Sequence, residues 1–481
     1  MRQLLIGPPG SGKTQKLISL IEEHSIRAEG KMILALSFSK TAARELGARS
    51  SDEVSCFTMH SYGNALLKGV DPDLQVLSAK HMKSLADAID LETKDVKDAI
   101  EAINKHDTMG YTNHPSQSQK FIDSNITTRM NSFVKNEYDD WRKKAGLVSF
   151  SDMLQADLMK DFRGHLLVLD EAQDCTWQQW QTFKRWSLQF DNVIVAGDPN
   201  QAMYVFAGAD PYLFCSEKNF YTERASFLGL GWRMAPKIHE VSEGFRRWIM
   251  GGDIDRYPFE PAAKDRGYAA QLYEYDAAYS QHIFRDSDRT NLMLARTKHQ
   301  LSAIAKYMEG MNIPFSMVTT KIDADGIDEE EKLVARGVHS DGIKAVIAFQ
   351  PYLMANEDVP EPVARKIHDW YSVSQLVAKD RTHNLYPNKQ ILSDFEVNFV
   401  DRYENDLQAA VDSCQTQLRT YHGSKGMSAD CVVVDSFMSK IVKEALATPE
   451  GRMEERQNYY VAITRARYRL HMGMYYEGVP R

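Results

Sequence analysis

The feature that most constrains this chain is its first glycine-rich segment, GPPGSGKT at residues 7–14, which follows the apolar run Leu4-Leu5-Ile6. The spacing G-x-x-x-x-G-K-[ST], between a predicted strand and the helical stretch QKLISLIEEH, is that of a phosphate-binding loop. Glycines there let backbone N–H groups surround phosphate oxygens at a helix N-terminus. The segment therefore predicts an α/β fold that binds a nucleotide.

The side chains of this loop have separate expected roles. We expect Lys13 to neutralise the β- and γ-phosphates and Thr14 to offer its hydroxyl to Mg²⁺. The predicted nucleotide-binding residues of the loop are Gly7, Gly10, Ser11, Gly12, Lys13 and Thr14. An ordinary glycine-proline turn is the alternative, which the strand and helix on either side disfavour. The loop alone does not separate kinases, GTPases, transporters and motors, since all of them share it.

Further apolar runs indicate how the chain is organised. They occur ahead of polar or glycine turns at 32–38, 165–170, 192–198, 291–296 and 431–436. Helical stretches separate them, which predicts mostly parallel sheets covered by helices. The chain has 481 residues, too many for one compact core.

We divide the chain into two α/β units and two insertions. The first unit is expected at 1–65 and 140–215, and the second at 216–320 and 411–481. The stretches 66–139 and 321–410 carry apolar residues at helical spacing and are expected to be helical insertions. The second insertion opens with the acidic DADGIDEEEK, which we expect to be a solvated loop.

Composition indicates the cellular compartment and where positive charge must lie. The five cysteines include no CxxC pair, which fits a reducing compartment and disfavours a zinc site or disulfide scaffold. No apolar run approaches 18 residues and no secretory leader is recognisable, so we expect an intracellular protein of the prokaryotic or viral cytoplasm. The net charge is −8, so any positive potential for nucleic acid must be confined to a groove.

A second motif adds acid chemistry. The stretch LLVLDEAQD at 166–174 puts Asp170 and Glu171 at the carboxyl end of a predicted buried strand, where α/β sheets carry their active sites. We expect Asp170 to hold Mg²⁺ through its shell, and Glu171 to orient and deprotonate the attacking water. A kinase must exclude water and has no use for such a base. Helix capping is the alternative for two neighbouring acids, but beside the loop they favour nucleotide hydrolysis.

Seven ordered segments resemble one family. The chain is similar to the UvrD/Rep/PcrA-like DNA helicases of superfamily one from residue 7 to about 470, in the segments ILALSFSKTAARELGAR, TMHSYGNALL, LDEAQD, AGDPNQAMYVFAGAD, LGLGWRMAPKI, RTYHGSKGMSADCVVV and YYVAITRAR. The resemblance implies two RecA-like P-loop domains with parallel sheets, each interrupted by a reduced helical insertion. It also implies ATP and Mg²⁺ as cofactors.

The segment AGDPNQAMYVFAGAD is informative without the family. Gln201 follows Asp198 by three residues at a predicted strand end, where it would sense a γ-phosphate. Tyr204 and Phe206 lie two residues apart among small residues and suit a stacking platform for bases, worth about 1–3 kcal/mol per base. Packing in a hydrophobic core is the alternative, because aromatic pairs commonly pack there.

The resemblance implies further DNA contacts. Phe38 would be another stacking residue. Thr58, His60, Thr420 and His422 would contact the backbone of the strand. For the two histidines, a satisfied structural role is the alternative.

Two arginines far along the chain complete the expected nucleotide site. The family places the counterparts of Arg233 and Arg465 across the cleft on the γ-phosphate, where an arginine finger stabilises charge in the transition state. Solvated surface arginines are the alternative. Trp232 would stack on adenine. ATP would then close the cleft, hydrolysis would reopen it, and the motion would become a step along DNA.

Three departures from the family pattern stand out. Ala207 and Ser428 occupy positions where relatives usually carry arginine and glutamate, so the coupling between ATP and DNA is open to change. The upstream segment with an adenine-reading glutamine has no room before the first strand, so base selectivity would depend mainly on Trp232.

Three functions remain open at this stage. The leading hypothesis is an ATP-dependent DNA helicase or translocase moving 3′→5′ on single strands, a monomer that binds single-stranded DNA and single/double-strand junctions. Replication or repair proteins are its candidate partners. The alternative is an ATP-driven translocase that displaces proteins with little unwinding. A P-loop kinase is the third, but it leaves Glu171, Gln201 and Arg465 without a role.

Overall fold

The computed structural model describes residues 1–89, 91–108, 138–250, 258–272, 289–321, 332–354, 392–403, 406–435 and 439–473. Most of the acidic stretch DADGIDEEEK, at 323–331, lies outside the described residues, as does the predicted helix PVARKIHDWYSV at 362–373. Within the described residues, no helix has the length and apolar character needed to cross a membrane.

The first sheet is parallel throughout and has the order β3-β2-β6-β7-β1-β8. Its strands are β1 (Arg2–Ile6), β2 (Ile33–Ser37), β3 (Val54–Thr58), β6 (Gly164–Asp170), β7 (Phe190–Gly197) and β8 (Ser226–Phe227). Every residue of β2 and β6 is buried, as expected for parallel strands covered on both faces. The strands predicted from the runs at 32–38, 165–170 and 192–198 are therefore confirmed.

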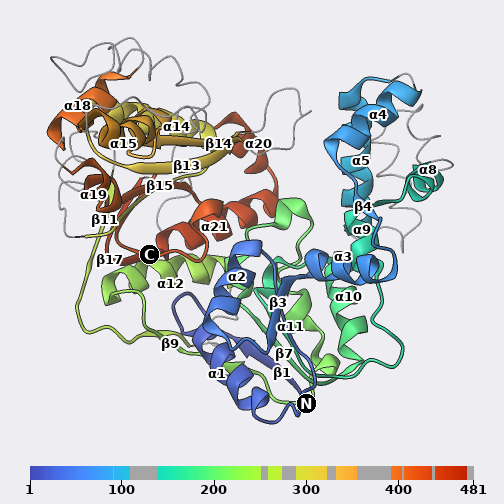
Figure 1. Ribbon diagram of the computed structural model, residues 1–481. Helices are drawn as coiled ribbons and strands as arrows, with labels where there is room; N and C mark the ends of the chain where they lie inside the picture. The colour runs from blue at the N-terminus through green and yellow to red at the C-terminus, as the bar shows by residue number, and fades with distance from the viewer. Residues whose placement is uncertain are drawn as a thin grey trace.

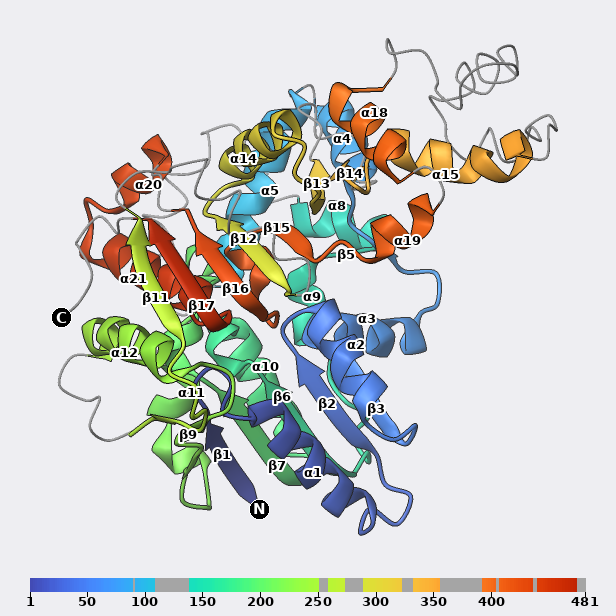
Figure 2. The ribbon, with the colours of Figure 1, turned by 90° about the vertical axis from the view of Figure 1, so that its left-hand side faces the viewer.

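Helices cover both faces of this sheet (Figure 2). Helices α1 (Lys13–Ser25) and α2 (Lys40–Arg49) bury Leu17 and Leu46 against one face. Helices α3 (Met59–Val70) and α10 (Trp177–Ser187) bury Tyr62 and Trp180 against the other. Shorter elements of this unit are α9 (Phe150–Gln155), η2 (Ala172–Asp174), η3 (Pro199–Gln201), η4 (Val205–Ala207), α11 (Leu213–Ser216) and η5 (Lys218–Phe220).

A helical column rises from the first unit between α3 and α9 (Figure 1). It contains α4 (Ala79–Ile89), α5 (Thr93–Thr108) and α8 (Tyr138–Lys144), with a small parallel pair of strands, β4 (Gln75–Val76) and β5 (Leu147–Val148). Its own hydrophobic core includes Leu85, Val96, Ile100 and Tyr138. This core is separate from that of the sheet, and α5 also contacts α9 and α10 of the first unit.

The second sheet has the order β11-β17-β16-β12-β15-β13-β14. Its strands are β11 (Tyr268–Leu272), β12 (Asn291–Ala295), β13 (Ser316–Lys321), β14 (Lys332–Gly337), β15 (Thr416–Thr420), β16 (Ala429–Val434) and β17 (Ala466–Gly473). All neighbours are parallel except β13 and β14. The strands predicted at 291–296 and 431–436 are confirmed as β12 and β16.

Strand β14 was not expected in the stretch 321–410, where the sequence predicts an acidic loop followed by helices. It pairs antiparallel with β13 from Ser316↔Gly337 to Lys321↔Lys332 and extends the sheet edge. The sequence KLVARG carries a three-residue apolar run, Leu333–Ala335, which is too short to separate a strand from a helix by its pattern. Helices do follow, namely α15 (Asp341–Met354), α18 (Asp394–Arg402) and α19 (Leu407–Asp412), around a core that includes Ile343, Phe395 and Phe399.

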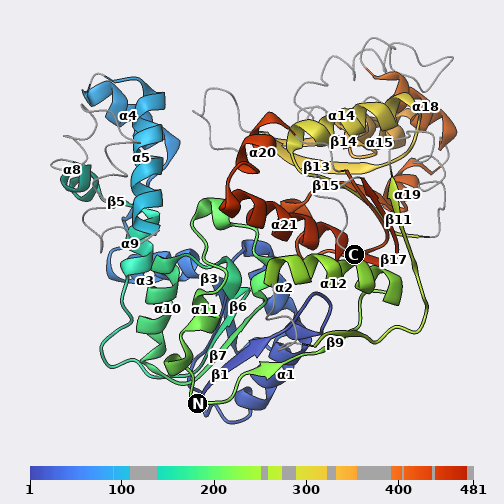
Figure 3. The ribbon, with the colours of Figure 1, turned by 180° about the vertical axis from the view of Figure 1, so that it is seen from behind.

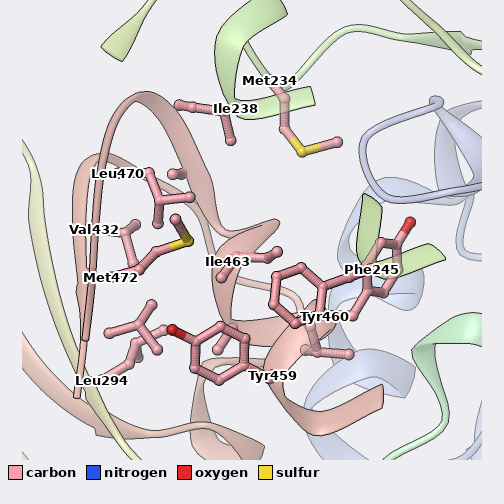
Figure 4. Packing of buried hydrophobic residues seen from close by; sticks show 14 of the residues in the cluster. Met234, Ile238, Phe245, Leu294, Val432, Tyr459, Tyr460, Ile463, Leu470 and Met472 are labelled. Carbon is pink, nitrogen blue, oxygen red and sulfur yellow. The ribbon is translucent and has the colours of Figure 1, made fainter. Parts of the chain in front are cut away.

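Helices α12 (Pro236–Met250) and α21 (Pro449–Ile463) pack side by side across the middle of the molecule (Figure 3). Figure 4 shows Phe245, Tyr459, Tyr460 and Ile463 of these helices against apolar side chains of the second sheet, among them Leu470. The remaining described elements are α14 (Lys298–Gly310), η7 (His422–Ser424), α20 (Lys440–Ala445), β9 (Leu230–Gly231) and β10 (Glu260–Pro261). The core thus joins α12 and α21 to the second sheet and directs one side of them at the first unit.

Candidate nucleotide and DNA site

The glycine-rich loop connects β1 to α1 in the geometry that the motif predicts. Gly10 and Gly12 have φ of 73° and 81°, the left-handed region that favours glycine. A Cβ at Gly12 would meet nothing within 4 Å, so the space beside it is open. A Cβ at Gly10 would lie 2.3 Å from the Cβ of Arg233, so the loop packs closely against that residue.

The donors of the loop fit a phosphate group. Lys13 is only 8% exposed, and its Nζ lies 3.7 Å from Oε1 of Glu171. The hydroxyl of Ser11 is buried and has no hydrogen-bond partner among the described residues. A buried donor of this kind costs free energy unless a ligand meets it. Together with the open space at Gly12, these observations support phosphate binding by residues 7–14.

Asp170 ends β6 and is 5% exposed. Burial, reinforced by the neighbouring charge of Glu171, raises the pKa of Asp170 to about 6. A cation near this carboxylate would favour its ionised form. No cluster of three or more His, Cys, Asp or Glu within the described part of the chain is arranged to hold a metal. A magnesium ion here would therefore rely on Asp170, the hydroxyl of Thr14 and phosphate oxygens, the hard oxygen ligands that Mg²⁺ prefers.

Glu171 has an unusual backbone and two cationic neighbours. Its φ is 58°, a left-handed conformation that costs a non-glycine residue free energy and is found at functional sites. Burial raises the pKa of Glu171, but the ammonium groups of Lys13 and Lys425 outweigh it and bring the pKa below its ordinary value. The carboxylate is therefore ionised at neutral pH and able to accept a proton.

Lys425 is a site residue that the sequence interpretation missed. It follows η7 in the second unit, yet its Nζ lies 3.4 Å from Oε2 of Glu171 and forms an ion pair with Asp174. Burial lowers the pKa of Lys425, but Asp174 and Glu171 raise it well above its usual value. The only signal in the sequence was a charged residue inside RTYHGSKGMSADCVVV, and nothing local to that motif identifies its partners.

Gln201 and Arg465 connect the two units at the nucleotide site. Gln201 Nε2 donates to Asp198 Oδ2 at 2.8 Å, and Arg465 Nη2 donates to Gln201 Oε1 at 3.2 Å. Arg465 is 2% exposed, and its Nε also donates to the Val461 carbonyl at 2.8 Å. The solvated-surface alternative for this arginine is therefore wrong.

Arg233 lies close to Arg465, on a segment that packs against Gly10 of the phosphate-binding loop. Its Nη1 donates to the Thr464 carbonyl at 3.4 Å, and burial with the charge of Arg467 lowers its pKa to about 10. The pKa of Arg465 is also lowered, first by burial and then by the charge of Arg233. An anion between the two guanidinium groups would relieve their repulsion. Trp232 donates its backbone N–H to Gly10 at 2.8 Å, while its side chain is 68% exposed and accessible to a base.

The predicted stacking residues meet in one aromatic cluster. Phe38 and Tyr204 have ring centroids 4.5 Å apart, and the ring of Phe206 lies 6.2 Å from that of Tyr204. His422 packs edge-on against Tyr204 and Phe206, and its Nε2 lies 2.9 Å from the Met203 carbonyl. Phe206 is 55% exposed, so core packing is not its role. The structure therefore brings Phe38, Tyr204, Phe206 and His422 together, from both units.

The remaining predicted DNA contacts have structural tasks as well. Thr58 and Ser61 form a capping box at the start of α3, with Ser61 N–H donating to Thr58 Oγ1 at 3.1 Å. His60 packs edge-on against Phe150 at 5.3 Å, and burial lowers its pKa to about 4. Thr420 Oγ1 accepts a hydrogen bond from Gly423 N–H at 3.1 Å. Thr58, His60 and Thr420 therefore each have a local structural contact.

Two of the departures noted in the sequence, Ser428 and Ala207, have simple local surroundings. Ser428 Oγ accepts hydrogen bonds from Nε and Nη2 of Arg467, at 3.2 and 2.9 Å. Ala207 ends η4 beside Gly208, whose φ is 92°. Neither residue contacts the nucleotide site through a side-chain hydrogen bond in the described part of the structure.

Two family models match the chain. A model described as the UvrD/REP helicase N-terminal domain matches residues 2–222, and one described as the UvrD-like helicase C-terminal domain matches residues 366–477. The first match contains the loop at 7–14 and both acids. The second contains Lys425 and Arg465.

Similar curated proteins include an ATP-dependent DNA helicase Rep of Buchnera aphidicola subsp. Baizongia pistaciae (strain Bp). It is 24% identical over 357 residues, which are 66% of this chain and 52% of the relative. An ATP-dependent DNA helicase PcrA of Staphylococcus epidermidis (strain ATCC 35984) is 21% identical over 360 residues, which are 66% of this chain and 48% of the relative. The chain thus spans about half the length of these relatives.

Proposed function

We propose that this chain, which belongs to the UvrD/Rep helicase family, is an ATP-dependent motor that moves 3′→5′ along single-stranded DNA and unwinds duplexes. The proposal keeps the two α/β units with one correction: the first unit, expected at 1–65 and 140–215, extends to residue 227, because Phe220 packs in its core and β8 pairs with β1. The second unit therefore begins after β8 rather than at residue 216, and continues to 320 and over 411–481. It also includes a monomer that acts on single strands and single/double-strand junctions.

The observation that carries the proposal is the short segment from Asp198 to Phe206. Its first part supplies Gln201, which is hydrogen-bonded to Asp198 on one side and to Arg465 on the other. Its last part supplies the partly buried Tyr204 and the exposed Phe206 to the aromatic cluster. Because the segment is continuous, a displacement at its nucleotide end must also move the backbone that bears Tyr204 and Phe206. A DNA-coupled ATPase requires such a mechanical connection between its nucleotide site and its DNA site.

We assign the hydrolytic roles as follows. Ser11, Lys13 and the backbone of residues 7–14 hold the phosphates, and Thr14 with Asp170 would hold Mg²⁺. When bound, Mg²⁺ neutralises charge that develops on the phosphate oxygens. Glu171 orients the attacking water and accepts its proton, which requires the carboxylate to be ionised.

The second unit completes the cleft. Arg233 and Arg465 belong to the second unit, across the cleft from Lys13. The negative charge of a γ-phosphate would attract both guanidinium groups toward Lys13. Departure of the cleaved phosphate after hydrolysis would release them. Aromatic residues of both units line the DNA side, so opening and closing would shift bases from one stacking residue to the next.

Two assays test the proposal. ATP hydrolysis should rise when single-stranded DNA is added, and duplexes with a 3′ tail should be unwound whereas those with a 5′ tail should not. Hydrolysis that ignores DNA would contradict the motor. DNA-stimulated hydrolysis with protein displacement but no strand separation would favour the translocase that barely unwinds.

A further inference from the structure

Gln173 lies between the base and the sensor, and the mechanism above gives it no task. It belongs to η2 and has 0% of its surface exposed. Its Oε1 accepts a hydrogen bond from the backbone N–H of Asp198 at 3.0 Å, and its Nε2 donates to Oε2 of Glu171. One side-chain amide thus joins the carboxylate of Glu171 to the backbone at the end of β7.

The two partners determine the orientation of this amide. A backbone N–H only donates and an ionised carboxylate only accepts, so the oxygen and nitrogen of the Gln173 amide cannot exchange places. After an exchange, the amide NH₂ would face the Asp198 N–H, which is also a donor, and the amide oxygen would face the Glu171 carboxylate, which is also an acceptor. In a buried position each unmet polar group costs about 1–3 kcal/mol, so the observed orientation is strongly favoured.

The two oxygens of Glu171 have unequal surroundings. Oε2 accepts from Gln173 and lies 3.4 Å from Nζ of Lys425. Oε1 faces Lys13 at 3.7 Å, which is longer than a hydrogen bond. Oε1 therefore keeps lone pairs for a water molecule and is the better placed oxygen to accept its proton.

Gly197 provides the room for this arrangement. A Cβ at that position would lie 2.9 Å from Gln173 Oε1 and 2.8 Å from Cζ of Phe214. Phe214 is almost completely buried and has little freedom to move. A side chain at 197 would therefore displace the Gln173 amide from Asp198.

We propose that Gln173 is a positioning residue that holds Glu171 with Oε1 toward the attacking water and ties this orientation to the segment that bears Gln201. The inference rests on the proposed function, in which Glu171 is the base. Gln173 need not touch the nucleotide, because it acts through Glu171 and the Asp198 backbone.

The variant Gln173→Met tests the proposal, because methionine keeps the length and burial of the side chain but removes its amide. Single-turnover ATP hydrolysis with single-stranded DNA should fall by about 10²-fold, the order of loss that a misplacement of about 1 Å causes. Affinity for a fluorescent ATP analogue should stay near wild type. The thermal midpoint should fall modestly, because the buried N–H of Asp198 loses its acceptor, which costs about 1–3 kcal/mol. Gln178→Met is the matched control, since Gln178 is partly exposed and its amide bonds Ser151 at 2.6 Å, and it should keep full turnover.

Two further variants make the outcome decisive. In a Glu171→Gln background, Gln173→Met should cause little additional loss, because Gln173 acts through Glu171. Gln173→Glu keeps an acceptor for the Asp198 N–H but places a second carboxylate against Glu171, so its single-turnover hydrolysis should also be slow. This variant serves as the test if Gln173→Met does not fold. Normal turnover in the folded variants, or a loss of turnover matched by loss of nucleotide affinity, would overturn the inference. A wild-type protein without DNA-stimulated hydrolysis would instead overturn the proposed function.

Discussion

Two residues that form one ion pair are expected to give different phenotypes. Lys13 and Glu171 lie 3.7 Å apart, but the first faces the phosphates and the second faces the water. Lys13→Ala should abolish tight nucleotide binding. Glu171→Gln should keep binding and lose about 10²–10⁴-fold in turnover, the usual contribution of a general base. Titration of a fluorescent ATP analogue beside a phosphate-release assay measures both, and an equal loss of affinity in both variants would contradict the division of roles.

Arg465 is expected to act on the transition state. Its guanidinium reaches Gln201 across the two units, 264 residues apart in sequence. Arg465→Ala should reduce DNA-stimulated hydrolysis by about 10³-fold or more, as for an arginine finger, with little change in DNA affinity measured without nucleotide. Arg465→Lys is the control, because it keeps the charge but not the planar fork. Near-normal turnover of the alanine variant would assign Arg465 to structure alone.

At the scale of elements, η4 exposes Phe206 to solvent. The same segment carries Gln201, at the nucleotide site, a few residues earlier. Because the ring is 55% exposed, Phe206→Ala should leave no core cavity and the thermal midpoint should not change. Binding of a short single-stranded oligonucleotide should weaken by about 1–3 kcal/mol, the value of one stacked base.

The buried Phe183 of α10 provides the contrast for this test. Its side chain is 0% exposed, so Phe183→Ala should cost about 3–5 kcal/mol of stability through a cavity. Fluorescence anisotropy and a thermal melt separate the two effects. If Phe206→Ala melts early and loses all activities together, the exposed cluster is structural rather than a platform for DNA.

At the scale of the whole molecule, Lys425 links the two units through buried acids. Lys425→Met would leave Asp174, which is 1% exposed, without its cation, and should cost about 3–5 kcal/mol in the free energy of unfolding. Adding Asp174→Asn should restore part of this loss, because the uncompensated charge is then gone. Urea denaturation measures both variants. Additive losses in the double variant would show that the pair is not coupled.

The contact between His422 and Met203 also joins the units, and it should make stability depend on pH. Burial, with a further contribution from Arg296, lowers the pKa of His422 from 6.5 to about 4. Between these values the unfolded chain binds the proton more tightly, so the stability that neutral His422 contributes is full above pH 6.5 and is lost as the pH falls toward 4. The stability advantage of wild type over His422→Gln should therefore shrink between about pH 7.5 and about pH 5 in urea denaturation. An advantage that does not vary with pH would contradict the assignment.

Local motifs made much of the site predictable. The loop at 7–14, the acids at 170–171 and the aromatic pair at 204–206 each lie within a few residues, so covalent spacing alone limits how they can be arranged. Buried parallel strands need continuous apolar runs, which is why β2, β6, β7, β12 and β16 could be recognised from sequence. Strand β14 was missed because its apolar run, Leu333–Ala335, is short and lies within a stretch dominated by helical spacing.

The sequence by itself therefore determined the fold class, the phosphate loop and the chemical character of the two acids. Only the tertiary structure decided which distant side chains meet them: Lys425 with Glu171 and Asp174, Arg465 with Gln201, and Gln173 with the Asp198 backbone. The physical reason is the distance along the chain between the residues that meet. A motif is held together by the chain itself, whereas a contact between units depends on how the packed cores of two sheets orient their edges toward each other.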